Sequence, residues 1–242
     1  MATLVFDIET IGEPWESFDD VSKKSLTRWI ARTAKNDTEY KSELENLKNQ
    51  LGFSPLTGSI VALGMYDVER EQGAVYYVGD SSRESIVEGN FTYKERTESE
   101  LLKDFWEGAG SYDTFVTFNG RSFDVPFLLH RSVVHGIRPT VPLLGRRYLS
   151  QQTLPYHIDL QDELTFYGAM NRRPPLHLFC RAYGIESPKG EMGGEDIAEL
   201  FLQKKFRDIA AYNARDVVAT AELYELWKRH LAPASFLNTI EF

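Results

Sequence analysis

The chain has 242 residues, of which 42% are hydrophobic and 13% are aromatic, and its formal net charge is −9. An acidic balance argues against a protein that coats nucleic acid, although it leaves room for an enzyme with a local basic surface. The single cysteine, Cys180, excludes an internal disulfide. With no signal-peptide pattern and no hydrophobic run near the ~20 residues of a membrane span, we expect one cytoplasmic domain, residues 1–242, with no membrane partner.

Five segments rich in β-branched and aromatic residues predict strands, at 2–8, 59–66, 74–79, 112–118 and 156–160. Helical spacing of hydrophobic residues predicts helices at 97–107, 124–135, 160–168, 175–183, 194–204 and 206–230. This order indicates an α/β fold with a mixed sheet, antiparallel early in the chain and parallel later.

Residues 13–57 contain no strand pattern, so they predict a helical insertion between the first two strands. Within it, Lys24, Arg28 and Arg32 are spaced by four residues and therefore share one helix face. Two interpretations remain open for this face. It is either a solvated surface of a packed helix or a stripe that follows the phosphates of a nucleic acid.

The first strand ends in the letters "FDIET", which place Asp7 and Glu9 on either side of Ile8. Side chains alternate along a strand, so the two carboxylates point to the same face. Two like charges that lose their hydration repel each other, and a divalent cation would offset that cost. In open α/β sheets, ligands bind beyond the carboxyl ends of strands, which is where this pair lies.

The second acidic position is Asp124, in the stretch "FNGRSFDVPFL" between a strand and a helix. Asn119 and Gly120 predict a turn directly after the strand. Asp124 could cap the helix that follows, with Pro126 in the first turn, or it could serve a site, or both. Either way, its position indicates the same edge of the sheet as Asp7.

The third acidic position is Asp216, in the long C-terminal helix with the letters "YNARDVVAT". Asp216 falls on the hydrophobic face of that helix, and Tyr212 lies one turn before it on the same face. A carboxylate on a buried face needs a partner, which is either a distant base or a metal ion.

Taken together, the three stretches predict a metal centre built from carboxylates. Oxygen ligands without a cysteine or histidine cluster favour Mg²⁺ or Mn²⁺ over zinc. Four negative charges, on Asp7, Glu9, Asp124 and Asp216, could balance two divalent ions, which is the arrangement used for attack on phosphates.

The same residues carry a resemblance to a known family. "FDIET", "FNGRSFDVPFL" and "YNARDVVAT" resemble the three exonuclease motifs of the DEDD superfamily of 3′–5′ exonucleases, and Tyr212 is typical of its tyrosine branch (DEDDy). The sequences of these motifs are most similar to those of the stand-alone predicted exonucleases related to the proofreading domain of family-B DNA polymerases. The resemblance covers residues 1–12 and 57–230.

This resemblance implies a ribonuclease-H-like fold and a two-metal mechanism with Mg²⁺ or Mn²⁺. It implies that Asp7, Glu9, Asp124 and Asp216 bind the metals and that Tyr212 orients the attacking water. The implied activity is 3′–5′ hydrolysis of single-stranded DNA from its 3′ end, in proofreading or DNA repair.

Residues that would bind the nucleic acid are expected beside the motifs and in basic segments. These candidates are Phe118, Asn119, Arg121, Phe123, Arg146, Arg147, Arg172, Arg173 and Lys189, together with Lys24, Arg28 and Arg32 of the insertion. A core position remains an alternative for the two phenylalanines, and an unpartnered basic surface for the arginines. His157 is expected to serve structure, and Asp159 to cap the helix that follows it.

Two other functions remain open. The first is an exonuclease that trims RNA, because tyrosine-branch relatives act on RNA too. The second is a non-catalytic module that binds nucleic acid, which the complete set of Asp7, Glu9, Asp124, Asp216 and Tyr212 argues against.

Overall fold

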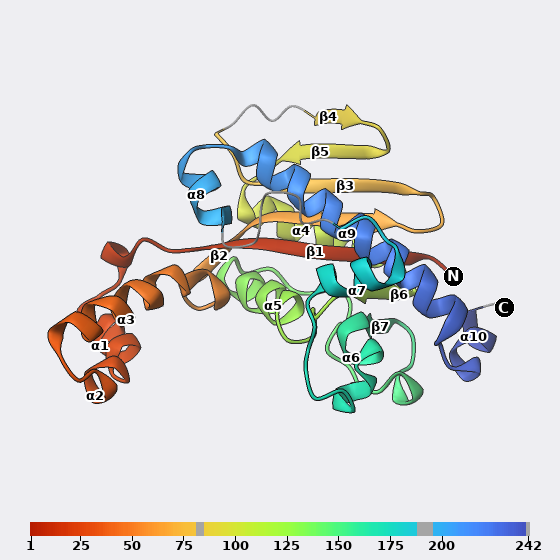
Figure 1. Cartoon of the computed structure of the whole chain (residues 1–242). Helices are drawn as coiled ribbons and strands as arrows, with labels where there is room; N and C mark the ends of the chain where they lie inside the picture. Colours follow the sequence, from red (N-terminus) through yellow and green to blue (C-terminus); the bar gives the residue numbers. More distant parts are fainter. Residues whose placement is uncertain (81–84, 188–195, 241–242) are drawn as a thin grey trace.

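Seven strands form one mixed sheet in the computed structural model, which describes residues 1–80, 85–187 and 196–240 (Figure 1). Their order across the sheet is β4-β5-β3-β2-β1-β6-β7. The strands are β1 (Thr3–Gly12), β2 (Gly58–Asp67), β3 (Gln72–Tyr77), β4 (Ser85–Glu88), β5 (Phe91–Glu95), β6 (Thr114–Thr117) and β7 (Tyr156–Asp159). The expected α/β fold with a mixed sheet is confirmed.

The strand directions change at β1. On one side, β1 is antiparallel to β2, and β2 is antiparallel to β3. On the other side, β1 is parallel to β6, and β6 is parallel to β7. The expectation of antiparallel pairing early and parallel pairing later is confirmed for these five strands. The carboxyl ends of β1, β6 and β7 therefore reach the same edge of the sheet, where a site is expected.

The hairpin of β4 and β5 extends the sheet beyond β3, and the sequence did not predict it. The two strands are antiparallel, and β5 pairs in parallel with β3. Gly89, between them, has a φ of 59°, which glycine adopts without strain. Every residue of β4 is exposed, so this strand has no alternating hydrophobic pattern that would reveal it.

The sheet separates two hydrophobic cores. The flanking helices are α4 (Glu98–Ala109), α5 (Asp124–Val134), α6 (Leu160–Leu164), α7 (Leu176–Tyr183), α8 (Ile197–Leu202), α9 (Phe206–His230) and α10 (Ala234–Ile240). Val5 of β1 belongs to the core beneath α9, whereas Leu4, Phe6 and Ile8 belong to the core beneath α4 and α5. The long helix α9 crosses β1, β2 and β3 (Figure 1). Odd-numbered residues of β1 therefore face α9.

Most helix boundaries follow the sequence, and the exceptions have local causes. Thr97 and Glu100 form the expected capping box at the start of α4. The expected helix over 160–168 ends at Leu164 because Phe166 and Tyr167 have positive φ, and a short 3₁₀ turn, η4 (Phe166–Gly168), follows. The helix expected at 194–204 begins, within the described residues, at Ile197. The sequence did not indicate α10.

The insertion between β1 and β2 is helical, as expected. It contains η1 (Trp15–Ser17), α1 (Asp20–Thr27), α2 (Ile30–Thr33), α3 (Asp37–Asn49) and η2 (Leu51–Phe53). Asp19 caps α1 and Asn36 caps α3, each by accepting a backbone hydrogen bond. In Figure 1 these helices extend from the carboxyl end of β1, next to α5. The insertion therefore stands at the edge of the sheet where the site is expected.

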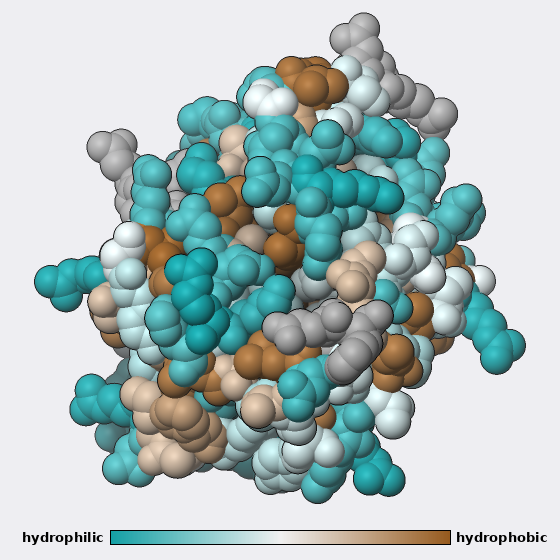
Figure 2. Space-filling view, turned by 90° about the vertical axis from the view of Figure 1, so that its right-hand side faces the viewer, coloured by the Kyte–Doolittle hydropathy of each residue, from teal (hydrophilic) through white to brown (hydrophobic). Residues whose placement is uncertain are grey.

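Within the described ranges, no helix combines the length and the hydrophobicity that crossing a membrane would require. Figure 2 shows the side of the molecule on which β1 begins and α10 lies. The hydrophobic residues coloured on this face occur in small patches between hydrophilic ones.

Candidate active site

Asp7 and Glu9 of β1 point to the face of the sheet that α9 covers, while Ile8 between them lies in the opposite core. The pairing of β1 with β2 is irregular directly after Glu9: Glu9 pairs with Ala62, but Thr10 pairs with Ile60. Such a bulge bends the strand and re-aims its side chains, and bulges are common beside active sites. The alternation expected from the letters "FDIET" is confirmed.

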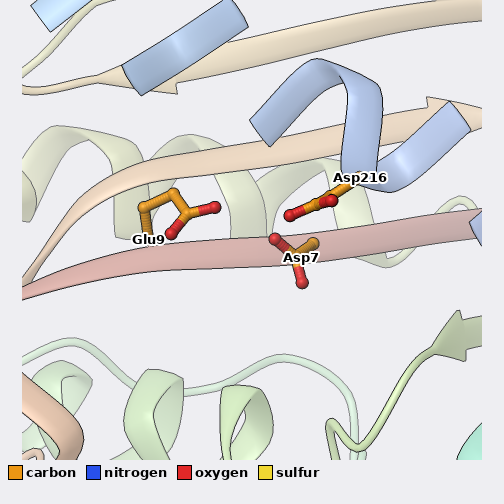
Figure 3. A group of neighbouring side chains, drawn as sticks. All are labelled: Asp7, Glu9 and Asp216. Atoms are coloured by element: carbon orange, nitrogen blue, oxygen red, sulfur yellow. The ribbon is translucent and has the colours of Figure 1, made fainter. Parts of the chain in front are cut away.

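Asp216 of α9 meets the two carboxylates of β1 (Figure 3). One carboxylate oxygen from each of Asp7, Glu9 and Asp216 lies within 4.8 Å of the others. Glu9 is buried, whereas Asp7 and Asp216 are partly exposed. The group is therefore enclosed by protein and still reachable from solvent.

Tyr212 lies one turn before Asp216 on the same face of α9. It is buried, and its side chain is hydrogen-bonded to the Asp216 carboxylate. Burial raises the pKa of Tyr212 above its usual value, and the charges of Asp216, Glu9 and Asp7 raise it further. Its hydroxyl group therefore keeps its proton and acts as a hydrogen-bond donor within the group.

The side chain of Asp124 is connected to the site by a hydrogen bond from the backbone of β1. It is the first residue of α5, with Phe123 in the cap position, and its side chain does not cap the helix. Instead, Asp124 Oδ1 accepts a hydrogen bond from the backbone nitrogen of Ile8, 3.0 Å away. Of the two alternatives for Asp124, the helix cap is therefore excluded, because the carboxylate bonds across to β1, between Asp7 and Glu9. Only 3% of Asp124 is exposed.

The electrostatics of this group favour an added cation. Burial raises the pKa of Asp7 well above its usual value, and the charges of Asp124, Asp216 and Glu9 raise it further. Burial and the charges of Asp216 and Asp124 do the same to the pKa of Glu9. Burial raises the pKa of Asp124 to about 7, although the hydrogen bond that Asp124 accepts from Ile8 acts to lower it. Crowded carboxylate oxygens of this kind are the ligands that Mg²⁺ and Mn²⁺ prefer, so the residues fit such ions.

Asn213 orients the Asp7 carboxylate and was not singled out from the sequence. Asn213 Nδ2 donates a hydrogen bond to Asp7 Oδ2 at 2.7 Å, and the side chain is fully buried. Gly64, which pairs with Asp7 across the sheet, provides the space for it. A Cβ atom at Gly64 would lie 2.4 Å from Asn213 Oδ1. The signal was present in the letters "YNARD", because Asn213 lies three residues before Asp216 and so shares its helix face.

The loop before Asp124 is fixed by Asp159, at the end of β7. Its two carboxylate oxygens accept hydrogen bonds from the backbone nitrogens of Asn119 and Arg121, both at 2.9 Å. Asp159 also caps α6, as expected, and Asn119 adopts a φ of 65° in the predicted turn. One buried carboxylate thus holds the turn after β6 against the start of α6.

His157 has the expected structural role. Its Nε2 atom lies 2.9 Å from Thr117 Oγ1, and its Nδ1 atom lies 2.9 Å from the carbonyl oxygen of Leu143. Burial lowers the pKa of His157 to about 3, so this buried imidazole is neutral at physiological pH. It links β7 to β6 and to the loop that contains Leu143.

The two phenylalanines predicted to bind nucleic acid flank the second motif. Phe118 packs on Phe179 at the edge of the core beneath α9. Phe123 packs on Phe127 and on Phe53 of the insertion. Both rings are partly buried, as the alternative of a core position predicts.

The predicted arginines differ in the contacts that they make with the rest of the protein. Arg147 and Arg173 both form ion pairs with Asp162, and Arg121 donates a hydrogen bond to the carbonyl oxygen of Gly145. Arg146 and Arg172 are exposed. The remaining candidates lie elsewhere: Lys24, Arg28 and Arg32 are exposed on the insertion, and Lys189 lies outside the described residues.

The fold is similar to that of a family B DNA polymerase from the hyperthermophilic archaeon Pyrobaculum calidifontis. The TM-score is 0.57, with 18% sequence identity over 94% of this chain and 24% of the polymerase chain. The chain thus spans about a quarter of that polymerase, and at this identity the likeness concerns the fold. The chain has a ribonuclease-H-like fold of the kind found in polymerase exonuclease domains.

A family model identifies the chain more closely. Residues 73–240 match the family described as predicted 3′–5′ exonucleases related to the exonuclease domain of PolB. Because this match covers more than half of the chain, the chain belongs to that family, whose members are hydrolases. The match includes Asp124, Tyr212 and Asp216, whereas Asp7 and Glu9 precede it. A search among curated proteins returned no match.

Proposed function

We propose that this chain is a metal-dependent 3′–5′ exonuclease that acts on the 3′ ends of single-stranded DNA, and that residues 1–242 form one exonuclease domain. The observation that carries the proposal is the meeting of Asp7, Glu9 and Asp216 within 4.8 Å in a chain of this family. Crowding three carboxylates from two distant segments is costly while they are charged, and a bound cation would offset that cost.

We assign the metal ligands on the same basis. Asp7, Glu9 and Asp216 would hold divalent ions, with Asp124 contributing from the start of α5. Four negative charges suit two ions of Mg²⁺ or Mn²⁺. When bound, such ions lower the pKa of a coordinated water and stabilise negative charge on the departing 3′ oxygen.

The protein's own groups position the reactants. The Tyr212 hydroxyl, which keeps its proton, would hold the attacking water rather than deprotonate it. Asn213 would keep the Asp7 carboxylate in one orientation. The water oxygen forms a bond to phosphorus, the bond from phosphorus to the 3′ oxygen breaks, and that oxygen receives a proton. The products are a nucleoside 5′-monophosphate and a strand shorter by one nucleotide.

The test uses a single-stranded DNA oligonucleotide labelled at its 5′ end, incubated with Mg²⁺, with Mn²⁺ and with a chelator. We expect a descending ladder with either metal and an intact strand with the chelator. An Asp7→Asn protein purified in parallel controls for a contaminating nuclease. An intact strand in every lane contradicts the proposal for DNA.

Two companion measurements separate the alternatives. A ribo-oligonucleotide of the same sequence tests whether the site accepts a 2′-hydroxyl group, which would identify an RNA-trimming enzyme. Calorimetric titration with Mn²⁺ tests the metal centre without any substrate. Absence of Mn²⁺ binding would favour a module that binds nucleic acid without cleaving it.

A further inference from the structure

A basic surface lies on the insertion, away from the carboxylate group. Lys24, Arg28 and Arg32 are exposed and line one hollow of about 460 Å³, whose lining also includes Val21 and Ala31. The three residues do not lie on one helix as expected, because Lys24 is in α1, Arg28 follows its end and Arg32 is in α2; they nevertheless line the same hollow. Within the ranges that the structure describes, none of the three forms a salt bridge.

The charge of this surface contrasts with that of the chain. Between Asp20 and Asp37 there are no acidic residues and five basic ones, so this stretch carries +5 in a chain of net charge −9. The basic residues are Lys23, Lys24, Arg28, Arg32 and Lys35. A local positive surface on an acidic protein attracts polyanions to that place and not elsewhere.

The insertion also touches the candidate active site. Helix α3, with 13 residues, is about 20 Å long and has α2 before it and η2 after it in the chain. In η2, the ring of Phe53 lies 6.5 Å from the ring of Phe123, the residue before Asp124. Phe53 is nevertheless 63% exposed. One end of the insertion therefore presents an aromatic face beside the site, and the other end presents the basic hollow.

We infer that the insertion is an arm that holds the single strand upstream of its 3′ end. Lys24, Arg28 and Arg32 bind phosphates, and the open face of Phe53 stacks on a base that approaches the site. This inference rests on the proposed function for the direction of the strand. At ~3.4 Å per phosphate, 20 Å corresponds to about six nucleotides, or fewer in an extended strand. A strand of three nucleotides therefore fills the site without reaching the hollow.

The first test measures binding without cleavage, by fluorescence anisotropy of a labelled 20-nucleotide strand in the presence of a chelator. We expect the triple variant K24Q/R28Q/R32Q to bind at least about tenfold more weakly at low salt. The slope of log affinity against log salt should become shallower by about 2, since each phosphate contact on a single strand contributes roughly 0.7. The matched control K103Q/K205Q/R229Q removes the same charge from exposed positions elsewhere and should change the affinity less than about twofold.

The second test concerns the aromatic face. Phe53→Leu keeps a hydrophobic contact with Phe123 but removes the ring, and should weaken binding about fivefold or more. Phe53→Tyr keeps the ring and should bind as the wild type does. Equal binding by the leucine variant and the wild type would overturn the stacking role of Phe53.

The third test uses the length of the substrate. In the presence of Mg²⁺, the K24Q/R28Q/R32Q variant should cleave a trinucleotide with an unchanged kcat/KM and a 20-nucleotide strand with a kcat/KM about tenfold lower. Equal losses on both lengths, or no loss on either, would overturn the inference. If the wild type cleaves neither strand but the binding difference persists, the proposed function fails while the arm stands.

Discussion

The surroundings of Asp162 and those of Asp7 and Glu9 shift the pKa of these carboxylates in opposite directions. Asp162, in α6, receives hydrogen bonds from Arg147 at 2.8 and 2.6 Å and from Arg173 at 3.0 Å. Burial alone would raise the pKa of Asp162, but the arginines more than reverse this and the pKa lies below its usual value. At Asp7 and Glu9 the pKa lies above the usual value.

The difference distinguishes a structural ion pair from a prepared site. Asp162 has its counter-charges built into the chain, and its arginines join the loop before β7 to the segment after α6. For Asp7 and Glu9, by contrast, the side chain that lowers the pKa is an uncharged donor, Asn213, so their charge remains available to an added cation. Arg147 and Arg173 were expected to bind phosphates, and their bonds to Asp162 give them a structural role whether or not they also do so.

The largest effect is expected from Asp216→Asn, which removes one charge from the group of Asp7, Glu9 and Asp216. We expect the cleavage rate to fall by about a thousandfold, since metal ions contribute several kcal/mol to such reactions. The free energy of unfolding in chelator should stay the same or increase, because fewer like charges are crowded together. Ladder kinetics and urea unfolding measure the two quantities. A marked loss of stability would instead identify Asp216 as a structural partner.

A smaller effect is expected from Asn213→Ala, which leaves the Asp7 carboxylate without its fixed donor. Groups that orient metal ligands typically contribute 10–100-fold to metal affinity, so we expect a Mn²⁺ affinity lower by about that factor. Calorimetry without substrate measures it. Ser132→Ala removes a buried hydrogen bond from the opposite core and should leave the Mn²⁺ affinity unchanged.

Gly64→Ala is a second test of how the position of the Asn213 side chain affects the Mn²⁺ affinity. Its new Cβ atom would press on Asn213 Oδ1, so we expect a lower Mn²⁺ affinity from this change alone. In combination with Asn213→Ala the contact disappears, and the double variant should lose less affinity than the sum of the two single losses. Strict additivity would show that Gly64 and Asn213 act separately.

A different outcome is expected at the paired carboxylate. Asp162→Asn should lower the free energy of unfolding by about 1–2 kcal/mol, less than for a fully buried pair, because Arg147 and Arg173 are about half exposed. The Mn²⁺ affinity should stay within about twofold of the wild type. Urea unfolding and calorimetry test both, and a strong loss of Mn²⁺ binding would erase the contrast between the two groups.

The smallest effect is expected from a change of pH on the stability of the metal-free protein. For Asp7, Glu9 and Asp124, the folded protein holds protons that the unfolded chain has already released, so metal-free stability should fall as pH rises above about 4. The contribution of Asp124 to this fall extends to about pH 7. The slope is at most about 1.4 kcal/mol per pH unit for each proton. The lowered pKa of Asp162 acts only at lower pH, where acidification removes its contribution. Thermal unfolding in chelator between pH 5 and 8 should show the decline, and saturating Mn²⁺ should abolish it.

Sequence reasoning succeeded where one local pattern determines the geometry. Alternation along β1 places Asp7 and Glu9 on one face whatever the rest of the chain does. Helical spacing in α9 likewise places Tyr212 and Asp216 together. The turn at Asn119 and the cap at Asp159 each have a local sequence signal, and both were predicted, although Asp159 also bonds to that turn from 40 residues away.

The remaining features depend on contacts between distant segments. The bond of Asp124 to the nitrogen of Ile8 spans 116 residues, and a local pattern suggests a helix cap instead. The spacing of Asn213 and Asp216 indicates a shared helix face, but the contact of Asn213 with Asp7 depends on how α9 is rotated above Gly64. The partners of Arg147 and Arg173 depend on a fold around Asp162 that basic composition alone does not reveal.

The bond between Asn213 and Asp7 joins residues 206 positions apart. A chain leaving the ribosome therefore presents β1 long before α9 exists. Until Asp216 has emerged, Asp7 and Glu9 lack their third carboxylate and the donor that orients them. The group of three carboxylates therefore assembles only after α9 has been synthesised and has packed on β1, so the early part of the nascent chain carries no complete centre.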